Sequence, residues 1–429
     1  MGQTISEKIF SDHVGHPVKA GEIVVAPVDF VLSHDANRPQ PYQVLRQMGS
    51  DRVFDPRKVA LFIDHAPGVP NQAVSRVHNM MREFAREQGL ELSELGEGIC
   101  HQLMLEKGKV VPGDLVVGTD SHTCTYGALN ALSTGVGSSD LAVAMKTGKL
   151  WFKVPQTLRF LLEGDLPKGV YAKDLILRLI GMVGAEGANY LAVEFLGPTV
   201  GKLTMDSRLT ITNMAIEMGA KFGIMEADET TLAWLKERTD RPFKSYRSDP
   251  DAAILREYRV EVSSLEPQVA KSHSPANAVS VGEVLGTPIQ QATIGTCTNG
   301  RLEDLRIAAA LLRGRRPAPG VRLFVTAASR SIYRSALREG LIDVFLEAGA
   351  AIGTPGCTGC TGGSAFGVPA DGENMITTAN RNFKGRTGNN KAFIYLASPA
   401  TVTASALEGR IADPRPYLAE ARAKGVTAA

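Results

Sequence analysis

The 429-residue sequence is poor in the features that mark exported, membrane-bound or nucleic-acid-binding proteins. It has only five cysteines, and aromatic residues make up 6% of the chain. No stretch approaches the roughly 20 consecutive apolar residues that a membrane-spanning helix needs. The first eight residues lack the apolar core of a signal peptide. We therefore expect a protein of the cytoplasm with no membrane partner.

The charge balance is close to neutral. Lysine and arginine number 47 against 45 aspartates and glutamates, which leaves a formal net charge of +2. A strongly basic surface is the usual sign of nucleic-acid binding, and this balance gives no reason to expect it. The odd and sparse set of five cysteines argues against a disulfide framework and for a reducing compartment.

The order of predicted elements indicates an α/β protein. Apolar strand-like runs alternate with amphipathic helical segments, which is typical of mainly parallel sheets. The composition changes near residue 155, and the polar, proline-containing stretch 263–280 predicts a crossover linker. A chain of this length should hold two to four structural units. We expect three domains, at residues 1–155, 156–270 and 271–429.

Three cysteines form the most distinctive pattern. Cys357 and Cys360 lie in a glycine-rich Cys-x-x-Cys turn, and Cys297 follows a predicted strand over residues 291–294. Two thiolates of one turn can reach one metal centre, and the start of a helix stabilises a thiolate. A cubane held by three cysteines keeps one iron open as a Lewis acid, whereas structural zinc usually takes four ligands. The spacing favours an iron–sulfur cluster and leaves open a zinc site with a distant histidine, or a thiol pair without metal.

Histidines beside carboxylates follow several of the predicted strands. In parallel α/β sheets the carboxyl ends of strands are where sites are built. A neighbouring carboxylate fixes the tautomer of a histidine and raises its pKa, which makes a usable general acid. Any one pair can be an ordinary loop histidine, but three among eight histidines favour a site. The three are His34-Asp35, Asp64-His65 and Asp120-Ser121-His122.

A basic segment follows the Cys-x-x-Cys turn. Asn380 and Arg381 adjoin in it, and Arg386 comes five residues after Arg381. Guanidinium groups at such a spacing suit the bidentate capture of carboxylates. A solvated basic loop is the alternative, and a nearby metal site makes that alternative weaker.

Taken together, these motifs resemble the aconitase superfamily, and most closely the family of 3-isopropylmalate dehydratase large subunits. The resemblance runs over nearly the whole chain, and its motifs are long and keep their order. They lie at residues 117–137, 151–155, 170–177, 205–208, 213–217, 295–305, 380–386 and 395–399.

The resemblance implies a hydro-lyase with three α/β domains around one [4Fe-4S] cluster. Cys297, Cys357 and Cys360 match the cluster ligands, and His65 with Asp64 matches the pair that handles the leaving hydroxyl. The further positions that match catalytic residues are His101, Asp120, His122 and Glu217. The positions that match substrate-binding residues are His34, Asp35, Ser121, Asn380, Arg381 and Arg386.

The resemblance also implies a partner. Aconitase-type enzymes carry a fourth, swivelling domain in which a Ser-Ser-Arg motif supplies the catalytic base, and this sequence has no such motif. We expect a separate small subunit to provide that serine. The expected substrates are 3-isopropylmalate and 2-isopropylmalate of leucine biosynthesis. Homoaconitate, citraconate/2-methylmalate and dimethylmalate are the alternatives. Some cluster-free relatives bind RNA, which the near-neutral charge argues against.

Overall fold

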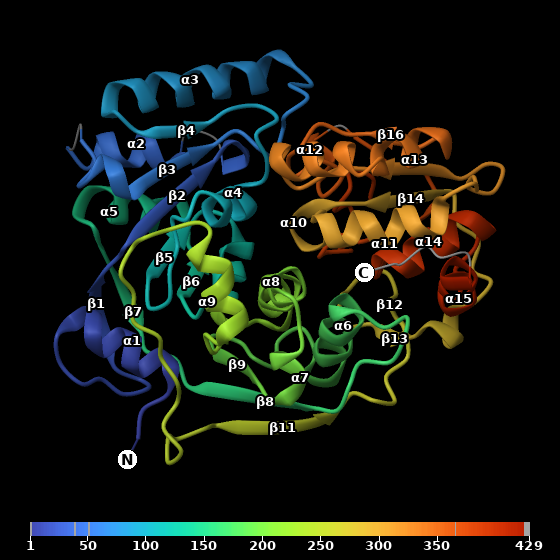
Figure 1. Ribbon diagram of the computed structural model, residues 1–429. Helices are drawn as coiled ribbons and strands as arrows, with labels where there is room; N and C mark the ends of the chain where they lie inside the picture. The colour runs from blue at the N-terminus through green and yellow to red at the C-terminus, as the bar shows by residue number, and fades with distance from the viewer. Residues whose placement is uncertain (1, 38–39, 50–51, 365, 424–429) are drawn as a thin grey trace.

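The computed structural model describes residues 2–37, 40–49, 52–364 and 366–423. Their strands form four sheets, and three of these sheets are wholly or mainly parallel, which confirms the predicted α/β class (Figure 1). None of the helices in these described ranges is long and apolar enough to cross a membrane.

The first large sheet has five parallel strands in the order β4-β3-β2-β5-β6. All residues of β3 and β5 are buried, because helices and neighbouring sheets cover both faces. Consecutive side chains therefore enter different cores: Leu61 packs in one cluster and Phe62 in another. The strands are β2 (Phe30–His34), β3 (Val59–Phe62), β4 (Glu91–Ser93), β5 (Leu115–Gly118) and β6 (Leu132–Gly135). The helices with them are α2 (Gln40–Gln47), α3 (Gln72–Gln88), α4 (Cys100–Glu106) and α5 (Ser138–Thr147).

A small antiparallel ribbon stands beside this sheet. It pairs β1 (Ile23–Pro27) with β7 (Lys149–Lys153), and α1 (Ile5–Val14) packs against it. Both strands alternate between buried and exposed residues, so the ribbon has one face on the core and one in solvent.

The second large sheet has four parallel strands in the order β10-β9-β8-β11. Its core includes apolar residues of α6 and α8, and α8 also packs against the segment after β5. The strands are β8 (Thr157–Glu163), β9 (Ala192–Leu196), β10 (Phe222–Met225) and β11 (Arg256–Glu261). The helices are α6 (Ala172–Val183), α7 (Pro198–Gly201), α8 (Met205–Asn213) and α9 (Glu229–Lys236).

The third large sheet has seven strands in the order β13-β12-β18-β17-β14-β15-β16. Five are parallel, and β12 and β13 add antiparallel pairs at one edge. The strands are β12 (Gln268–Ala270), β13 (Ala278–Ser280), β14 (Gln291–Ile294), β15 (Arg322–Val325), β16 (Ala351–Ile352), β17 (Asn374–Thr377) and β18 (Phe393–Ala397). The helices are α10 (Thr296–Asn299), α11 (Leu302–Leu312), α12 (Arg330–Arg338), α13 (Leu341–Glu347), α14 (Pro399–Glu408) and α15 (Arg415–Ala423).

Two predictions of local structure are wrong. The stretch 263–280 is not a plain linker, because β12 and β13 lie in it and the buried Val269 pairs with Ala397 of β18. The sequence of residues 331–348 also predicts continuous helix, and the structure has two helices there, α12 and α13. They are separated at Gly340, whose φ of 69° ends the helical path.

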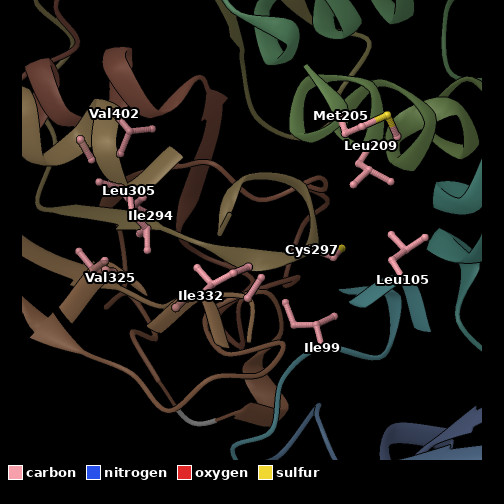
Figure 2. Close-up of a cluster of buried hydrophobic side chains, with 14 of the residues drawn as sticks. Ile99, Leu105, Met205, Leu209, Ile294, Cys297, Leu305, Val325, Ile332 and Val402 are labelled. Atoms are coloured by element: carbon pink, nitrogen blue, oxygen red, sulfur yellow. The ribbon is translucent and has the colours of Figure 1, made fainter. Parts of the chain in front are cut away.

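The three large sheets occupy residues 30–135, 157–261 and 268–397. Three domains remain our prediction, and the third sheet begins three residues before the expected boundary at 271. Residues 424–429 of the expected third domain lie outside the described ranges. One apolar cluster joins the units: Figure 2 shows Cys297 among Ile99, Leu105, Met205 and Leu209, which come from around α4 and from α8.

Candidate active site

Three neighbouring strands of the five-stranded sheet deliver the predicted histidine–carboxylate pairs. His34 is the last residue of β2, Asp64 and His65 follow β3, and Asp120 follows β5. Because β3, β2 and β5 are adjacent and parallel, their carboxyl ends bring these side chains together.

Asp120 is the centre of a buried network of histidines. Its Oδ2 lies 3.2 Å from His65 Nε2, and its Oδ1 lies 3.0 Å from His101 Nε2. The same Oδ1 lies 3.2 Å from His122 Nδ1 and accepts the His122 N–H at 2.6 Å. Burial would raise the pKa of Asp120, but the surrounding histidines hold that pKa well below its usual range.

His65 is arranged as a proton donor. Its Nδ1 lies 2.8 Å from Asp64 Oδ1, so the ring is held between Asp64 on one side and Asp120 on the other. Burial would lower the pKa of His65, but these two carboxylates raise it well above its ordinary value. The imidazole is therefore protonated near neutral pH, as a general acid must be.

His34 is neutral near neutral pH, unlike His65. It stacks on His65 with ring centroids 4.0 Å apart. Burial, followed by the positive charge of His65, lowers the pKa of His34 to about 4. Its Nε2 is buried and has no hydrogen-bond partner among the described residues, and it lies 3.9 Å from Asp120 Oδ2. This nitrogen is free to meet a ligand.

Asp35 accepts hydrogen bonds from the backbone of the loop that carries His65. Its carboxylate accepts the N–H groups of Asp64, His65 and Ala66 at 2.9 to 3.2 Å. His78 Nε2 lies 3.0 Å from Asp35 Oδ2 and completes the set. Sequence reasoning left His78 out because a single histidine in an amphipathic helix carries no local signal.

A second chain of contacts leads to the basic segment. His122 Nε2 lies 2.8 Å from Glu217 Oε1, and Arg381 Nε donates to the same oxygen at 2.7 Å. Burial and Arg381 lower the pKa of His122, but Asp120 and Glu217 raise it more, so the net shift is upward. The structure thus brings these four predicted residues together. Ser121 instead lines a hollow of about 280 Å³ with residues such as Thr119.

The three predicted cysteine ligands are buried, and two of them contact Asn380. Cys297 lies in α10, and the Asn380 Nδ2 donates to its sulfur at 3.2 Å. Cys360 Sγ lies 3.6 Å from Asn380 Oδ1, and Arg386 Nη2 donates to Cys360 Sγ at 3.1 Å. The amide of Asn213 also donates to Cys297 Sγ at 3.2 Å. Donors aimed at sulfur stabilise thiolates.

The thiol chemistry and spacing fit an iron–sulfur cluster. A hydrogen bond from Cys357 and the charge of Arg386 hold the pKa of the Cys360 thiol well below its usual range. Burial, with the negative Cys360 nearby, raises the pKa of Cys297 to about 12. Hydrogen-bond donors aimed at the sulfurs of Cys297 and Cys360 suit thiolate ligands of such a cluster.

Two buried cations support the site and were not singled out from the sequence. Arg301 donates to the carbonyls of Thr298 and Cys297 at 2.7 and 2.8 Å. Lys173 Nζ donates to the carbonyls of Thr378 and Ala379, both at 2.7 Å, just before Asn380. A charged residue inside the apolar helix of residues 172–183 was the available signal for Lys173.

Strand-end histidines facing three buried cysteines define an aconitase-like protein. The model of the aconitase family (aconitate hydratase) matches residues 7–288 and 282–409, and the chain belongs to this family. Both the fold and the family predicted from the sequence are confirmed.

Relatives match the chain over nearly its whole length. The 3-isopropylmalate dehydratase large subunit 1 of Methanopyrus kandleri is 49% identical over 419 residues, which is 97% of this chain and 100% of that protein. The large subunit of the same name from Aquifex aeolicus is 48% identical over 421 residues, 96% of this chain and 97% of that one. The crystal structure of Thermococcus kodakaraensis aconitase X (holo-form) has a TM-score of 0.50 at 13% identity, covering 88% of this chain and 89% of that chain. This last likeness concerns the fold alone.

Proposed function

We propose that this chain is the large, cluster-binding subunit of a 3-isopropylmalate dehydratase. The enzyme would interconvert 3-isopropylmalate and 2-isopropylmalate in leucine biosynthesis by removing water and adding it back. The observation that carries the proposal is the position of His65, held between Asp64 and Asp120 beside the cysteine loop, where both carboxylates raise its pKa. The identity of about 49% to proteins named for this reaction supports the choice of substrate.

The cysteines would hold one [4Fe-4S] cluster per chain. Cys297, Cys357 and Cys360 would be the ligands. Asn213 and Asn380 donate hydrogen bonds to the Cys297 sulfur, and the charged Arg386 donates one to the Cys360 sulfur. When bound, the cluster supplies a Lewis acid at the iron that no cysteine reaches.

The proton chemistry belongs to the chain itself. His65 would give its proton to the departing hydroxyl, and Asp64 keeps its other ring nitrogen in the right tautomer. Asp120 keeps the imidazole charged until the transfer and binds His101 as well. In the reverse direction the same nitrogen would take a proton from the incoming water.

The arginines suit the carboxylates of the substrate. Arg381 and Arg386 lie on the cysteine side of the site, and Arg381 is oriented by Glu217. Planar guanidinium groups bind carboxylates with two parallel hydrogen bonds. His34 Nε2, which has no hydrogen-bond partner among the described residues, would meet the substrate beside His65.

We further propose that a separate small subunit completes the enzyme. The relatives are named large subunits, which implies such a partner. It would supply the serine that removes the carbon-bound proton. All five cysteines of this chain are free thiols, which supports a cytoplasmic location.

The test is an assay of the reconstituted pair. The chain is co-expressed with the small subunit of the same organism, loaded with iron and sulfide without oxygen, and given 3-isopropylmalate. Ultraviolet absorbance of the unsaturated intermediate should rise, and the large chain alone should be inactive. Turnover of homoaconitate, citraconate or dimethylmalate in place of isopropylmalate would support the proposed reaction and assign a different substrate. No turnover of any of them, with the cluster present by electron paramagnetic resonance, would contradict the proposal.

A further inference from the structure

A pocket of about 450 Å³ opens beside the acid His65. One wall is the loop after β3, with His65 and Ala66. A second wall is the first part of α3, with Val74 and Val77, and Thr361 next to Cys360 lines a third side. The volume is in the range of small-molecule sites, which run from about 300 to 1,000 Å³.

This pocket has one apolar wall, whereas the network around Asp120 is charged; Asn71, Thr361 and His65 also line the pocket. Val74, Val77 and Ala66 line it, and both valines are only partly buried. The one carboxylate in the lining is Asp35, whose oxygens already accept three backbone N–H groups and a bond from His78. Asp35 therefore offers little to a polar ligand group, and the valine wall suits a hydrocarbon.

The pocket also lies at the end of the network away from the arginine Arg381. Contacts run from Arg381 through Glu217 and His122 to Asp120. From Asp120 they reach His65, and the pocket begins on that residue. A carboxylate bound at Arg381 would leave the remaining part of a substrate pointing towards α3, whereas Arg386 adjoins the loop of Thr361 on another side of the pocket.

We propose that this pocket binds the branched alkyl group of the substrate, and that Val74 and Val77 set the preference for an isopropyl group over a methyl group. This inference rests on the proposed function and adds its specificity determinant. A dicarboxylate with its hydroxyl at His65 has one apolar substituent to place, and the valine wall is the apolar surface beside that histidine. Losing one methyl contact in such a pocket changes discrimination by roughly 10- to 200-fold.

The experiment compares two substrates in the reconstituted two-subunit enzyme. Val74→Thr and Val77→Thr keep the side-chain shape and put a hydroxyl where the hydrocarbon would lie. We expect kcat/KM for 3-isopropylmalate to fall about tenfold or more in each variant. For 3-methylmalate it should change less than about threefold, because a methyl group does not reach the wall. Val143→Thr is the matched control, since Val143 is another partly buried valine, on α5.

A binding measurement separates recognition from chemistry. Calorimetry with the His65→Gln holoenzyme should show weaker binding of isopropylmalate, and unchanged binding of methylmalate, when Val77→Thr is added. If the valine variants lower kcat/KM for both substrates in equal proportion, or for neither, the inference is overturned and the proposed function stands. If the wild-type pair turns over no alkylmalate at all, both are overturned.

Discussion

His34 and His65 stack with ring centroids 4.0 Å apart and planes 20° apart, yet they hold different charges. Burial and the charge of His65 lower the pKa of His34 to about 4. Asp64 and Asp120 raise the pKa of His65 in spite of its burial. Two buried imidazoles in contact cannot both be charged at low cost, so the proton stays on the ring that has two carboxylates. One neutral and one charged ring is therefore a consequence of where the carboxylates lie.

The Asp64→Asn variant should lose activity at high pH. Asp64 Oδ1 lies 2.8 Å from His65 Nδ1, and its charge raises the pKa of that histidine. Without the charge, His65 loses its proton at a lower pH, so the fall of kcat/KM on the alkaline side begins at a lower pH. At about pH 8 we expect a loss of about 100-fold or more. The profile is measured on the reconstituted enzyme. Asp55→Asn, in an exposed pair with Arg57, is the control, and an unmoved alkaline limb would refute the assignment of the acid.

The stability of the chain should depend on His34 in mildly acid solution. Its folded pKa of about 4 is below the ordinary value of 6.5, so the unfolded chain binds the proton first as the pH falls. Stability is then fully present above about pH 6.5 and is lost towards pH 4, by up to about 1.4 kcal/mol for each pH unit. Urea unfolding at several pH values measures this loss. The His34→Gln variant should show a shallower slope, and an equal slope in both proteins would count against the buried neutral ring.

Removing one cysteine of the site should remove iron. In Cys297→Ser the sulfur that accepts from Asn213 and Asn380 is gone, and serine oxygen is a poor ligand for the metal. Iron and acid-labile sulfide should fall to background after reconstitution. Cys124→Ser is a fair control, because this buried thiol, which donates to the Asn213 carbonyl at 3.3 Å, is not one of the three expected ligands. Full iron content in Cys297→Ser would contradict the ligand set.

Gly127→Ala should destabilise the fold. A methyl group at Gly127 would stand 1.6 Å from the carbonyl oxygen of Gly223, so the backbone of β10 would have to move. Overpacking of this kind costs about 3 kcal/mol or more. Denaturant unfolding gives the free-energy difference. Gly201→Ala, where the added methyl meets nothing within 4 Å, should stay within about 0.5 kcal/mol of wild type.

The sequence predicts the fold well where strands are buried on both faces. Runs such as Val59–Phe62 are apolar throughout, and this pattern can be recognised in the sequence without knowing which strands lie next to them. The strands β12 and β13 escaped notice because each has three residues in a polar stretch. They pair with each other, and β12 also pairs with β18, which lies more than a hundred residues along the chain. The break at Gly340 escaped notice because one glycine in a helical pattern is often tolerated.

The site residues also divide into those that the sequence predicts and those that it does not. His65 and Asp120 follow apolar strands, so parallel pairing alone brings them to one edge of the sheet. His78 on α3 reaches Asp35, and Arg301, just before α11, reaches Gln102, only through the packing of the folded chain. The roles assigned to the site residues stay predictions until the variants above are measured. The described contacts supply the reasons to choose those variants.

The main-chain bond between Asp64 and Cys357 ties the two halves of the site together. The Cys357 N–H donates to the Asp64 carbonyl at 2.7 Å, so the turn with the paired sulfurs is fastened to the peptide that carries the proton donor. In the proposed enzyme, any shift of the turn at Cys357 on loss of the cluster would be transmitted through the Asp64 peptide to His65.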